Sequence, residues 1–128
     1  MGRIDLPGEF ASVAKARRYV RVLLTGIAHP RIDDAVLLVS ELVSNAVRHS
    51  DSALPGGKVT VSVAHGSGTL HIDVTDAGSA VNKPQLPAGI DHLGSSGRGL
   101  WLVDELSSAW GWYETDGGRV VWFRLTDG

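Results

Sequence analysis

Apolar residues between positions 32 and 47 repeat at helical spacing, and this run constrains the fold more than any other stretch. On a helical wheel they fill one stripe roughly 140° wide, made of Ile32, Ala35, Val36, Val39, Leu42, Val43, Ala46 and Val47. Glu41 and Asn45 stand one turn apart on the other side of this helix. Leu37 and Leu38 lie among the polar residues there, so that side is not plainly a solvated surface. Glu41 and Asn45 are therefore either ordinary surface residues or part of a site.

The rest of the chain predicts two more helices and five strands. Alternating apolar residues indicate strands, and Gly or Pro clusters indicate turns. The expected elements are a strand at Arg3–Leu6, a helix capped by Ser12 and stopped by Gly26, a hairpin of Val59–Val63 and Leu70–Val74, a helix from about Gly99 to Leu106, and a hairpin of Ala109–Glu114 and Arg119–Leu125. This order predicts an α+β fold, a two-layer sandwich whose mixed, mostly antiparallel sheet carries the helices on one face. We expect a single domain over residues 1–128.

Composition narrows the classes of protein that fit. Hydrophobic residues make up 43% of the 128 residues and charged residues 20%, which is typical of a globular domain. The formal charge of −2 gives no bulk electrostatic argument for a nucleic-acid or membrane partner. There is no cysteine, which excludes disulfides, thiolate metal sites and cysteine nucleophiles. No apolar run is long enough for a signal peptide or a membrane span, so we expect a cytoplasmic protein.

The first predicted helix carries a basic cluster made of Lys15, Arg17, Arg18 and Arg21. A charged run on a helix usually forms a solvated face. A basic face can also dock an acidic protein partner, because complementary charge steers association. Both interpretations stay open from the sequence.

Two further motifs carry candidate binding residues. Asp76-Ala77-Gly78 follows a predicted strand, where the Asp76 carboxylate could accept a hydrogen bond from an exocyclic amine and Gly78 allows a close backbone approach. By itself this pattern also fits an ordinary turn. The glycines from Gly94 to Gly99 end a long irregular stretch and open a helix, where free backbone N–H groups can bind an anion. This cluster is neither a Walker loop nor a Rossmann turn, since no Lys-Ser or Lys-Thr pair follows and no parallel βαβ unit surrounds it.

The order of the three motifs is more specific than any one of them. Glu-Leu-x-x-Asn-Ala-x-x-His (41–49), then Asp-x-Gly-x-Ala (76–80), then Gly-x-x-Gly-x-Gly-Leu (94–100), resembles the GHKL ATP-binding superfamily. Within it, the run 97–103 and Trp110-Gly111 are similar to the anti-sigma factor serine kinases and the regulatory ATP-binding proteins of actinomycetes. The resemblance covers essentially the whole chain. It implies the Bergerat ATP-binding fold, with ATP and Mg²⁺ as ligands.

The resemblance also implies roles for individual residues. Asn45 matches the amide that coordinates Mg²⁺, and Glu41 matches the carboxylate that polarises the attacking hydroxyl. Asp76 matches the carboxylate that recognises adenine, with Gly78 beneath the base. The stretch from Ser79 to Ser96 becomes a lid over ATP. The remaining nucleotide-binding positions are His49, Gly94, Gly97, Arg98, Gly99 and Leu100.

Two positions depart from the family pattern. A Thr usually follows Gly-Gly-x in the last motif, where it helps to hold a water and the Asp against adenine, but here Val120 follows Gly117-Gly118-Arg119. We expect this change to remove one hydroxyl from the adenine pocket. Ala80 stands where many relatives have a second glycine, which predicts a stiffer hinge for the lid.

The subfamily resemblance implies a serine/threonine protein kinase that binds a sigma factor and phosphorylates a Ser of an anti-anti-sigma (STAS-type) partner, and it implies a homodimer. The alternative is an ATP-binding interaction module that sequesters a partner with little or no turnover. Val120 favours this module, whereas the intact Glu41 and Asn45 favour the kinase. A histidine-kinase catalytic domain is a third possibility. It is disfavoured because we expect no room for a dimerisation helix pair bearing the phosphoacceptor His.

Overall fold

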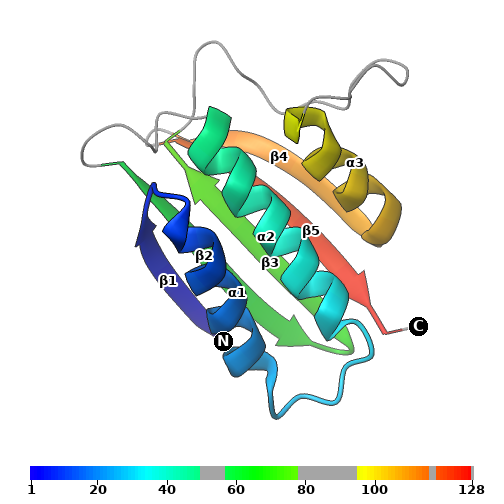
Figure 1. Ribbon diagram of the computed structural model, residues 1–128. Helices are drawn as coiled ribbons and strands as arrows, with labels where there is room; N and C mark the ends of the chain where they lie inside the picture. The colour runs from blue at the N-terminus through cyan, green and yellow to red at the C-terminus, as the bar shows by residue number, and fades with distance from the viewer. Residues whose placement is uncertain (50–56, 78–94, 116–117, 128) are drawn as a thin grey trace.

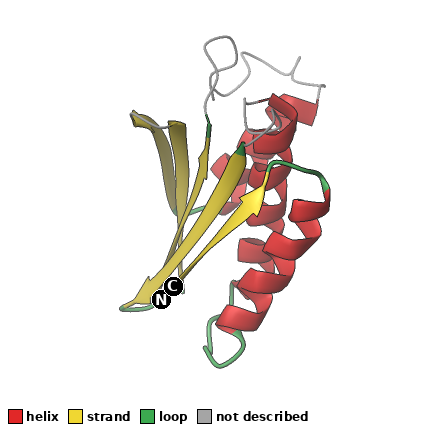
Figure 2. Cartoon of the chain, turned by 90° about the vertical axis from the view of Figure 1, so that its left-hand side faces the viewer, coloured by secondary structure: helices red, strands yellow, loops and turns green. Residues whose placement is uncertain are grey.

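The computed structural model describes residues 1–49, 57–77, 95–115 and 118–127, without the side chains of residues 49 and 95–100. The elements form two layers, a sheet and a set of helices on one of its faces (Figure 1 and Figure 2). The predicted α+β two-layer fold is therefore confirmed. In chain order the elements are β1 (Gly2–Pro7), α1 (Ala11–Leu24), α2 (Ile32–His49), β2 (Lys58–Gly66), β3 (Thr69–Asp76), α3 (Ser95–Leu106), β4 (Ala109–Thr115) and β5 (Gly118–Thr126).

The sheet has the strand order β1-β2-β3-β5-β4, so β5 lies between β3 and β4. All four pairings among the described strands are antiparallel, whereas we predicted a mixed, mostly antiparallel sheet. The reason is the position of β5, which forms a hairpin with β4 and also pairs with β3. β4 therefore lies at the edge of the sheet. It runs in the same direction as β3 but does not pair with it, because β5 lies between the two strands.

The core lies between the helices and one face of the sheet. In the helical layer, α2 lies between α1 and α3 (Figure 1). Every residue of the predicted stripe on α2 is buried or packs against the core, and Leu38 is fully buried as well. Successive side chains of a strand point to opposite faces, so each strand contributes alternate residues. These include Val59, Val61 and Val63 of β2, Leu70, Ile72 and Val74 of β3, and Val121, Phe123 and Leu125 of β5.

Polar contacts join the helices to the sheet at the end where β2 turns into β3. Ser67 and Gly68 form this turn with φ values of 52° and 77°, as a two-residue type I′ hairpin requires. Nδ1 of the buried His29 accepts a hydrogen bond from the backbone N–H of Arg31, so its Nε2 carries the proton and donates to the Gly68 carbonyl at 3.0 Å. The Arg31 side chain donates to the carbonyl of Leu106, the last residue of α3. These bonds tie the segment that leads into α2 to the β2–β3 turn and to the end of α3.

The start of α1 differs from its prediction. α1 begins at Ala11 with Phe10 at the N-cap position, so Ser12 lies inside the first turn and does not cap the helix. The buried Ser12 hydroxyl instead donates to the Pro7 carbonyl at 2.6 Å, which ties the end of β1 to α1. None of the described helices is both long and apolar enough to cross a membrane.

Candidate functional site

Four chain segments that are distant in sequence meet at one end of the molecule. The end of α2, the end of β3, the start of α3 and the start of β5 all lie at the top of Figure 1, and Figure 2 shows the same end from the side. These segments carry Glu41 to His49, Asp76, Gly97 to Leu100, and Gly118 to Val120. The motifs therefore gather at a single place in the fold.

Glu41 and Asn45 lie on α2 and are both partly buried. Leu38 is two helical turns before Asn45 on the same flank, and it has no exposed surface. Arg31, two turns before Leu38, contacts the end of α3 from this flank. The flank is thus covered by protein rather than by solvent. The Glu41 carboxylate and the Asn45 carboxamide lie at the border of this flank, one helical turn apart.

Asp76 is the last residue of β3, and Gly118 is the first residue of β5. A Cβ atom on Gly118 would lie 1.8 Å from the backbone oxygen of Asp76, so no side chain fits at this position. The glycine therefore permits a contact between the backbones of the Asp-x-Gly and Gly-Gly motifs. The sequence shows both motifs but not this contact, because it depends on the pairing of β3 with β5.

Asp76 lies on the face of the sheet that carries the helices. It is two residues beyond Val74, a core residue, and side chains two apart on a strand share a face. Its partner in the ladder is Arg119, which shares this face with the core residue Val121. Asp76 and Arg119 thus lie opposite each other on the adjacent strands β3 and β5, on the helix-bearing face of the sheet.

Val120 lies on the opposite face of the sheet. It pairs with Thr75, and the main core cluster does not include it. Its side chain points away from the face that carries Asp76. That Val120 removes a hydroxyl from the adenine pocket stays a prediction. The residue beside Asp76 is Arg119 instead.

Arg119 is 4% exposed, which is unusual for a charged side chain. The register places it opposite Asp76 on β3 and opposite Glu114 on β4. Its guanidinium carbon lies 5.7 Å from the ring centroid of Trp112, within the range of a cation–π contact. Our sequence analysis assigned no role to Arg119. The sequence does contain a signal for it. Counting back in steps of two from the buried residues of the last strand places Arg119 on the core face of the sheet.

Gly97 and Gly99 of the third motif lie inside α3. The helix begins at Ser95, four residues before the predicted start at Gly99. Glycine is a poor helix former and favoured the later start, but packing of Val103 against the core outweighs this preference. Gly97 is the third residue of the helix, so its N–H is among the first four, which have no partner within the helix. Gly99 is the fifth residue, and its N–H falls within the helical ladder.

The other predicted site features lie outside the described residues. These features are Gly78, Gly94, the lid stretch 79–94, and the side chains of His49, Arg98 and Leu100. Their roles stay predictions.

The described residues fit a magnesium nucleotide by the chemistry of their donors and acceptors. Asn45 offers an amide oxygen, Asp76 offers a carboxylate, and the start of α3 offers backbone N–H groups of the kind that bind phosphate. Within the described part of the chain, no group of three or more His, Asp or Glu is placed to hold a metal ion. Mg²⁺ does not need such a group, because it commonly takes one or two protein oxygens and completes its shell with phosphates and waters.

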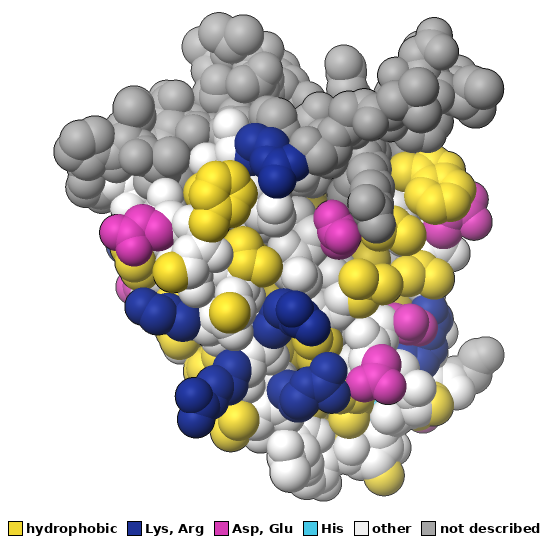
Figure 3. Space-filling model, in the orientation of Figure 1, with side chains coloured by type: hydrophobic (Ala, Val, Ile, Leu, Met, Phe, Trp, Pro, Cys, Tyr) yellow, Lys and Arg dark blue, Asp and Glu magenta, His cyan; other side chains and the backbone are white. Residues whose placement is uncertain are grey.

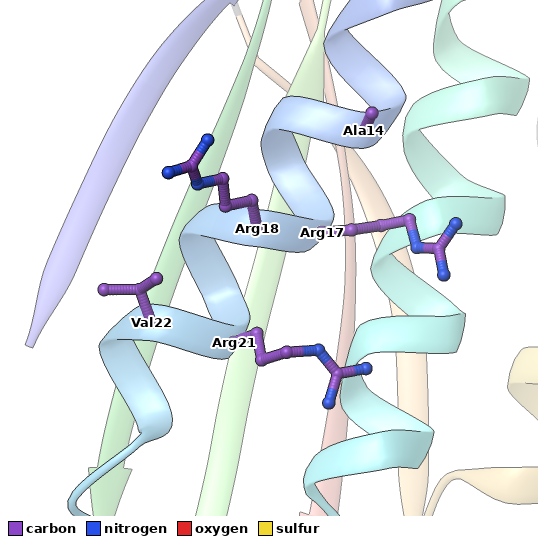
Figure 4. A pocket seen from close by; sticks show the side chains of 5 residues that line it. All are labelled: Ala14, Arg17, Arg18, Arg21 and Val22. Atoms are coloured by element: carbon purple, nitrogen blue, oxygen red, sulfur yellow. The ribbon is translucent and has the colours of Figure 1, made fainter.

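A second surface of interest lies on the outer side of α1. Lys and Arg side chains gather there on the helix-bearing side of the molecule (Figure 3). Val22 is 67% exposed between them. Arg21 forms an exposed ion pair with Asp33 of α2 at 3.2 Å, a type of contact that contributes little to stability. A shallow hollow in this surface is lined by Ala14, Arg17, Arg18, Arg21 and Val22 (Figure 4).

Comparison with known proteins gives one family and one fold. The sequence matches the family described as histidine kinase-like ATPase domain over residues 6–125. No curated protein matches it significantly. Two similar solved structures are nucleotide-free forms of the catalytic domain of histidine kinase ThkA, 11% and 12% identical, with TM-scores of 0.54 and 0.55. Each alignment covers 99% of this chain and 97% of that one, and at this identity the likeness shows the fold alone.

Proposed function

The chain belongs to the histidine kinase-like ATPase domain family, and on that premise we propose that it is an ATP-binding regulatory protein kinase of the anti-sigma type. The observation that carries the proposal is the meeting of three motifs at one end of the fold. The polar border of α2, the Asp76–Gly118 contact and the start of α3 are brought together by elements far apart in sequence.

Each residue has a defined task in this proposal. Asp76 accepts a hydrogen bond from the exocyclic amine of adenine, and the first turn of α3 donates backbone N–H groups to phosphate oxygens. The Asn45 amide oxygen would be a ligand of Mg²⁺, which when bound supplies positive charge that offsets the charge of the phosphates. Glu41, one turn away on α2, polarises the hydroxyl of the acceptor serine.

The proposed protein partners are an anti-anti-sigma (STAS-type) protein, whose serine receives the phosphate, and a sigma factor that the chain sequesters, with the chain acting as a homodimer. Support for a protein partner comes from α1, where Arg17, Arg18 and Arg21 line a hollow together with the exposed Val22. Such a surface complements a partner that carries acidic groups around an apolar side chain. Charge reversal of the three arginines should slow association and reduce its salt dependence.

The second candidate is a binding module that holds ATP and a partner but transfers little phosphate. Val120 supports it less directly than the sequence alone suggests, since that residue does not face Asp76. The position of Arg119 supplies a different argument, because a buried arginine stands opposite Asp76 in the strand register, at the end of the sheet where the motifs gather.

Transfer of label from γ-labelled ATP tests the two candidates. Wild-type protein with Mg²⁺ and a panel of anti-anti-sigma proteins should label one of them, and the label should survive acid, as phosphoserine does and phosphohistidine does not. Glu41→Gln should slow transfer by about 10²–10³-fold, the usual size of a general-base contribution, while ATP affinity stays within a few-fold. Glu9→Gln, an exposed carboxylate outside the site, is the matched control.

The outcomes separate the candidates. If the wild type binds ATP and the partners but labels none of them, the kinase is excluded and the binding module stands. An acid-labile label would point to a histidine acceptor instead. Failure to bind Mg²⁺–ATP at millimolar concentration would exclude both candidates.

A further inference from the structure

The two edges of the sheet are built differently, and the difference begins with β1. This edge strand carries the charged, exposed side chains of Arg3 and Asp5, which form an ion pair at 3.5 Å. It ends at Pro7, which has no backbone N–H to donate to a further strand. Charged side chains and proline are the features by which proteins keep a sheet edge from pairing with another chain. β1 is therefore a protected edge.

β4, at the other edge, lacks these features. Its seven residues, Ala109–Thr115, include no Lys, Arg or Pro, and three of them are aromatic. Five of the seven are exposed. β5 pairs with one side of β4, and none of the described strands is added to its other side. Because the backbone N–H and C=O groups of a strand point alternately to its two sides, β4 offers donors and acceptors to a further strand.

Aromatic side chains lie on both faces of the sheet at this edge. Trp112 lies opposite the core residue Val121, on the helix-bearing face, and is 36% exposed. Tyr113 lies opposite Val120, on the other face, and is 51% exposed. Aromatic residues are enriched at protein–protein interfaces, and a strand added beside β4 would cover both rings. The composition of β4 thus favours an interface over a solvated edge.

The length of β4 fits a second copy of the same strand. When two identical strands pair antiparallel about a two-fold axis perpendicular to the sheet, one residue lies opposite itself. Trp112 is the middle residue of Ala109–Thr115, so a register centred on Trp112 pairs all seven residues.

The side chains of β4 also fit this register. It places Tyr113 of one copy opposite Gly111 of the other. The Trp122 ring lies across Gly111, because a Cβ atom there would meet this ring at 2.9 Å. The Tyr113 ring can therefore pack over the glycine against Trp122. Glu114 lies opposite Trp110 and not opposite its own counterpart, so no like charges face each other directly.

We propose that β4 is the dimer interface of this protein. Two copies pair antiparallel through their β4 edges, about a two-fold axis at Trp112, and join their five-stranded sheets into one sheet with all helices on the same face. The inference rests on the homodimer of the proposed function and names its interface. It leaves the basic surface of α1 open for a protein partner, since α1 lies at the β1 side of the sheet (Figure 1).

Cross-linking through a single introduced cysteine tests the register. The chain has no cysteine, so any disulfide of a one-cysteine variant joins two copies. With oxidised glutathione as the oxidant, Trp112→Cys should cross-link into dimers, because residue 112 lies opposite itself. Arg3→Cys, an exposed position on the protected edge, is the matched control and should stay monomeric on a non-reducing gel.

Sedimentation equilibrium of the full chain tests the interface without a disulfide. Tyr113→Lys should raise the dimer dissociation constant by about tenfold or more, because each dimer loses two aromatic contacts and gains a lysine at each edge. Ala64→Lys adds the same charge to the same face at an exposed position of β2, away from the edge, and should leave the constant unchanged. Mg²⁺–ATP affinity, measured by calorimetry, should stay within about threefold in both variants.

The outcomes separate the interface from the rest of the proposed function. A dimer that Tyr113→Lys leaves as tight as the wild type, or a folded Trp112→Cys protein that cross-links no faster than Arg3→Cys, overturns the β4 interface. A wild type that stays monomeric at about 0.5 mM overturns both the interface and the homodimer. Nucleotide binding is measured separately, and its failure overturns the proposed function instead. If Trp112→Cys fails to fold, the sedimentation of the wild type and Tyr113→Lys still decides.

Discussion

The two faces of the sheet carry different chemistry, although the same strands supply both. The helix-bearing face is apolar along the middle of β3 and β5 and becomes charged at one end, where Asp76 and Arg119 follow the core residues Val74 and Val121. Alternation continues unbroken through this change. The candidate site is therefore the continuation of the core face past its last apolar residues.

The opposite face, which none of the described helices covers, is polar and aromatic. Trp122 stacks on His71 with ring centroids 5.7 Å apart, and the Arg124 guanidinium carbon lies 5.1 Å from the Trp122 ring centroid. Arg124 Nε donates to His71 Nδ1 at 3.1 Å, so His71 Nε2 carries the proton and donates to Asp73 at 2.9 Å. These contacts satisfy one another, which suits a structural surface. On a face that binds a ligand, by contrast, donors and acceptors point toward the ligand rather than only toward one another.

The largest expected difference between the faces is in stability. Phe123→Ala should lower the free energy of unfolding by about 3–5 kcal/mol, because Phe123 has no exposed surface and its loss leaves a cavity in the core. Trp122→Ala removes a larger side chain from the next position, but from the open face, and should cost about 1–2 kcal/mol. Urea denaturation followed by far-ultraviolet circular dichroism measures both. Equal losses would contradict the assignment of the core to one face.

A smaller loss is expected where the two motifs touch. Gly118→Ala should destabilise the protein by about 2–4 kcal/mol, since the new Cβ would overlap the backbone oxygen of Asp76 and the strands must separate to relieve it. Gly66→Ala is the matched control, because a Cβ there meets nothing within 4 Å and the change should stay within about 0.5 kcal/mol. The same denaturation curves measure both variants. A neutral Gly118→Ala would show that β5 does not approach Asp76 so closely.

The smallest effect concerns the open face at β1. The hydrogen bond from Thr60 to Asp5, 2.7 Å long, lowers the pKa of Asp5 below its ordinary value of 3.8, with help from the charges of Lys58 and Arg3. A lowered pKa in the folded state stabilises the protein above pH 3.8, and this stabilisation is lost as the pH falls through the folded pKa. Thr60→Val should raise the pKa of Asp5, as a carboxyl-resolved NMR titration would show. An unchanged pKa would assign the effect to Lys58 and Arg3.

Periodicity predicted the fold better than it predicted the neighbours within the site. The apolar stripe of α2 and both hairpins follow from local spacing, and the structure confirms them. The order of strands does not follow, because the insertion of β5 beside β3 is a long-range pairing. That pairing decides that Arg119, and not Val120, lies beside Asp76. Ser12 failed as a cap for a similar reason, since its hydroxyl binds the end of β1 rather than its own helix.

The central claim is that the end of the helix-bearing face binds a nucleotide through Asp76. Calorimetric titration with Mg²⁺–ATP of two variants from one strand tests it most directly. Asp76→Asn should weaken binding by roughly 1.5–3 kcal/mol through loss of a charged hydrogen bond to the base, whereas Asp73→Asn, which alters the open face, should change affinity by less than about threefold. Equal affinities of both variants and the wild type, or weakening by Asp73→Asn alone, would contradict the account.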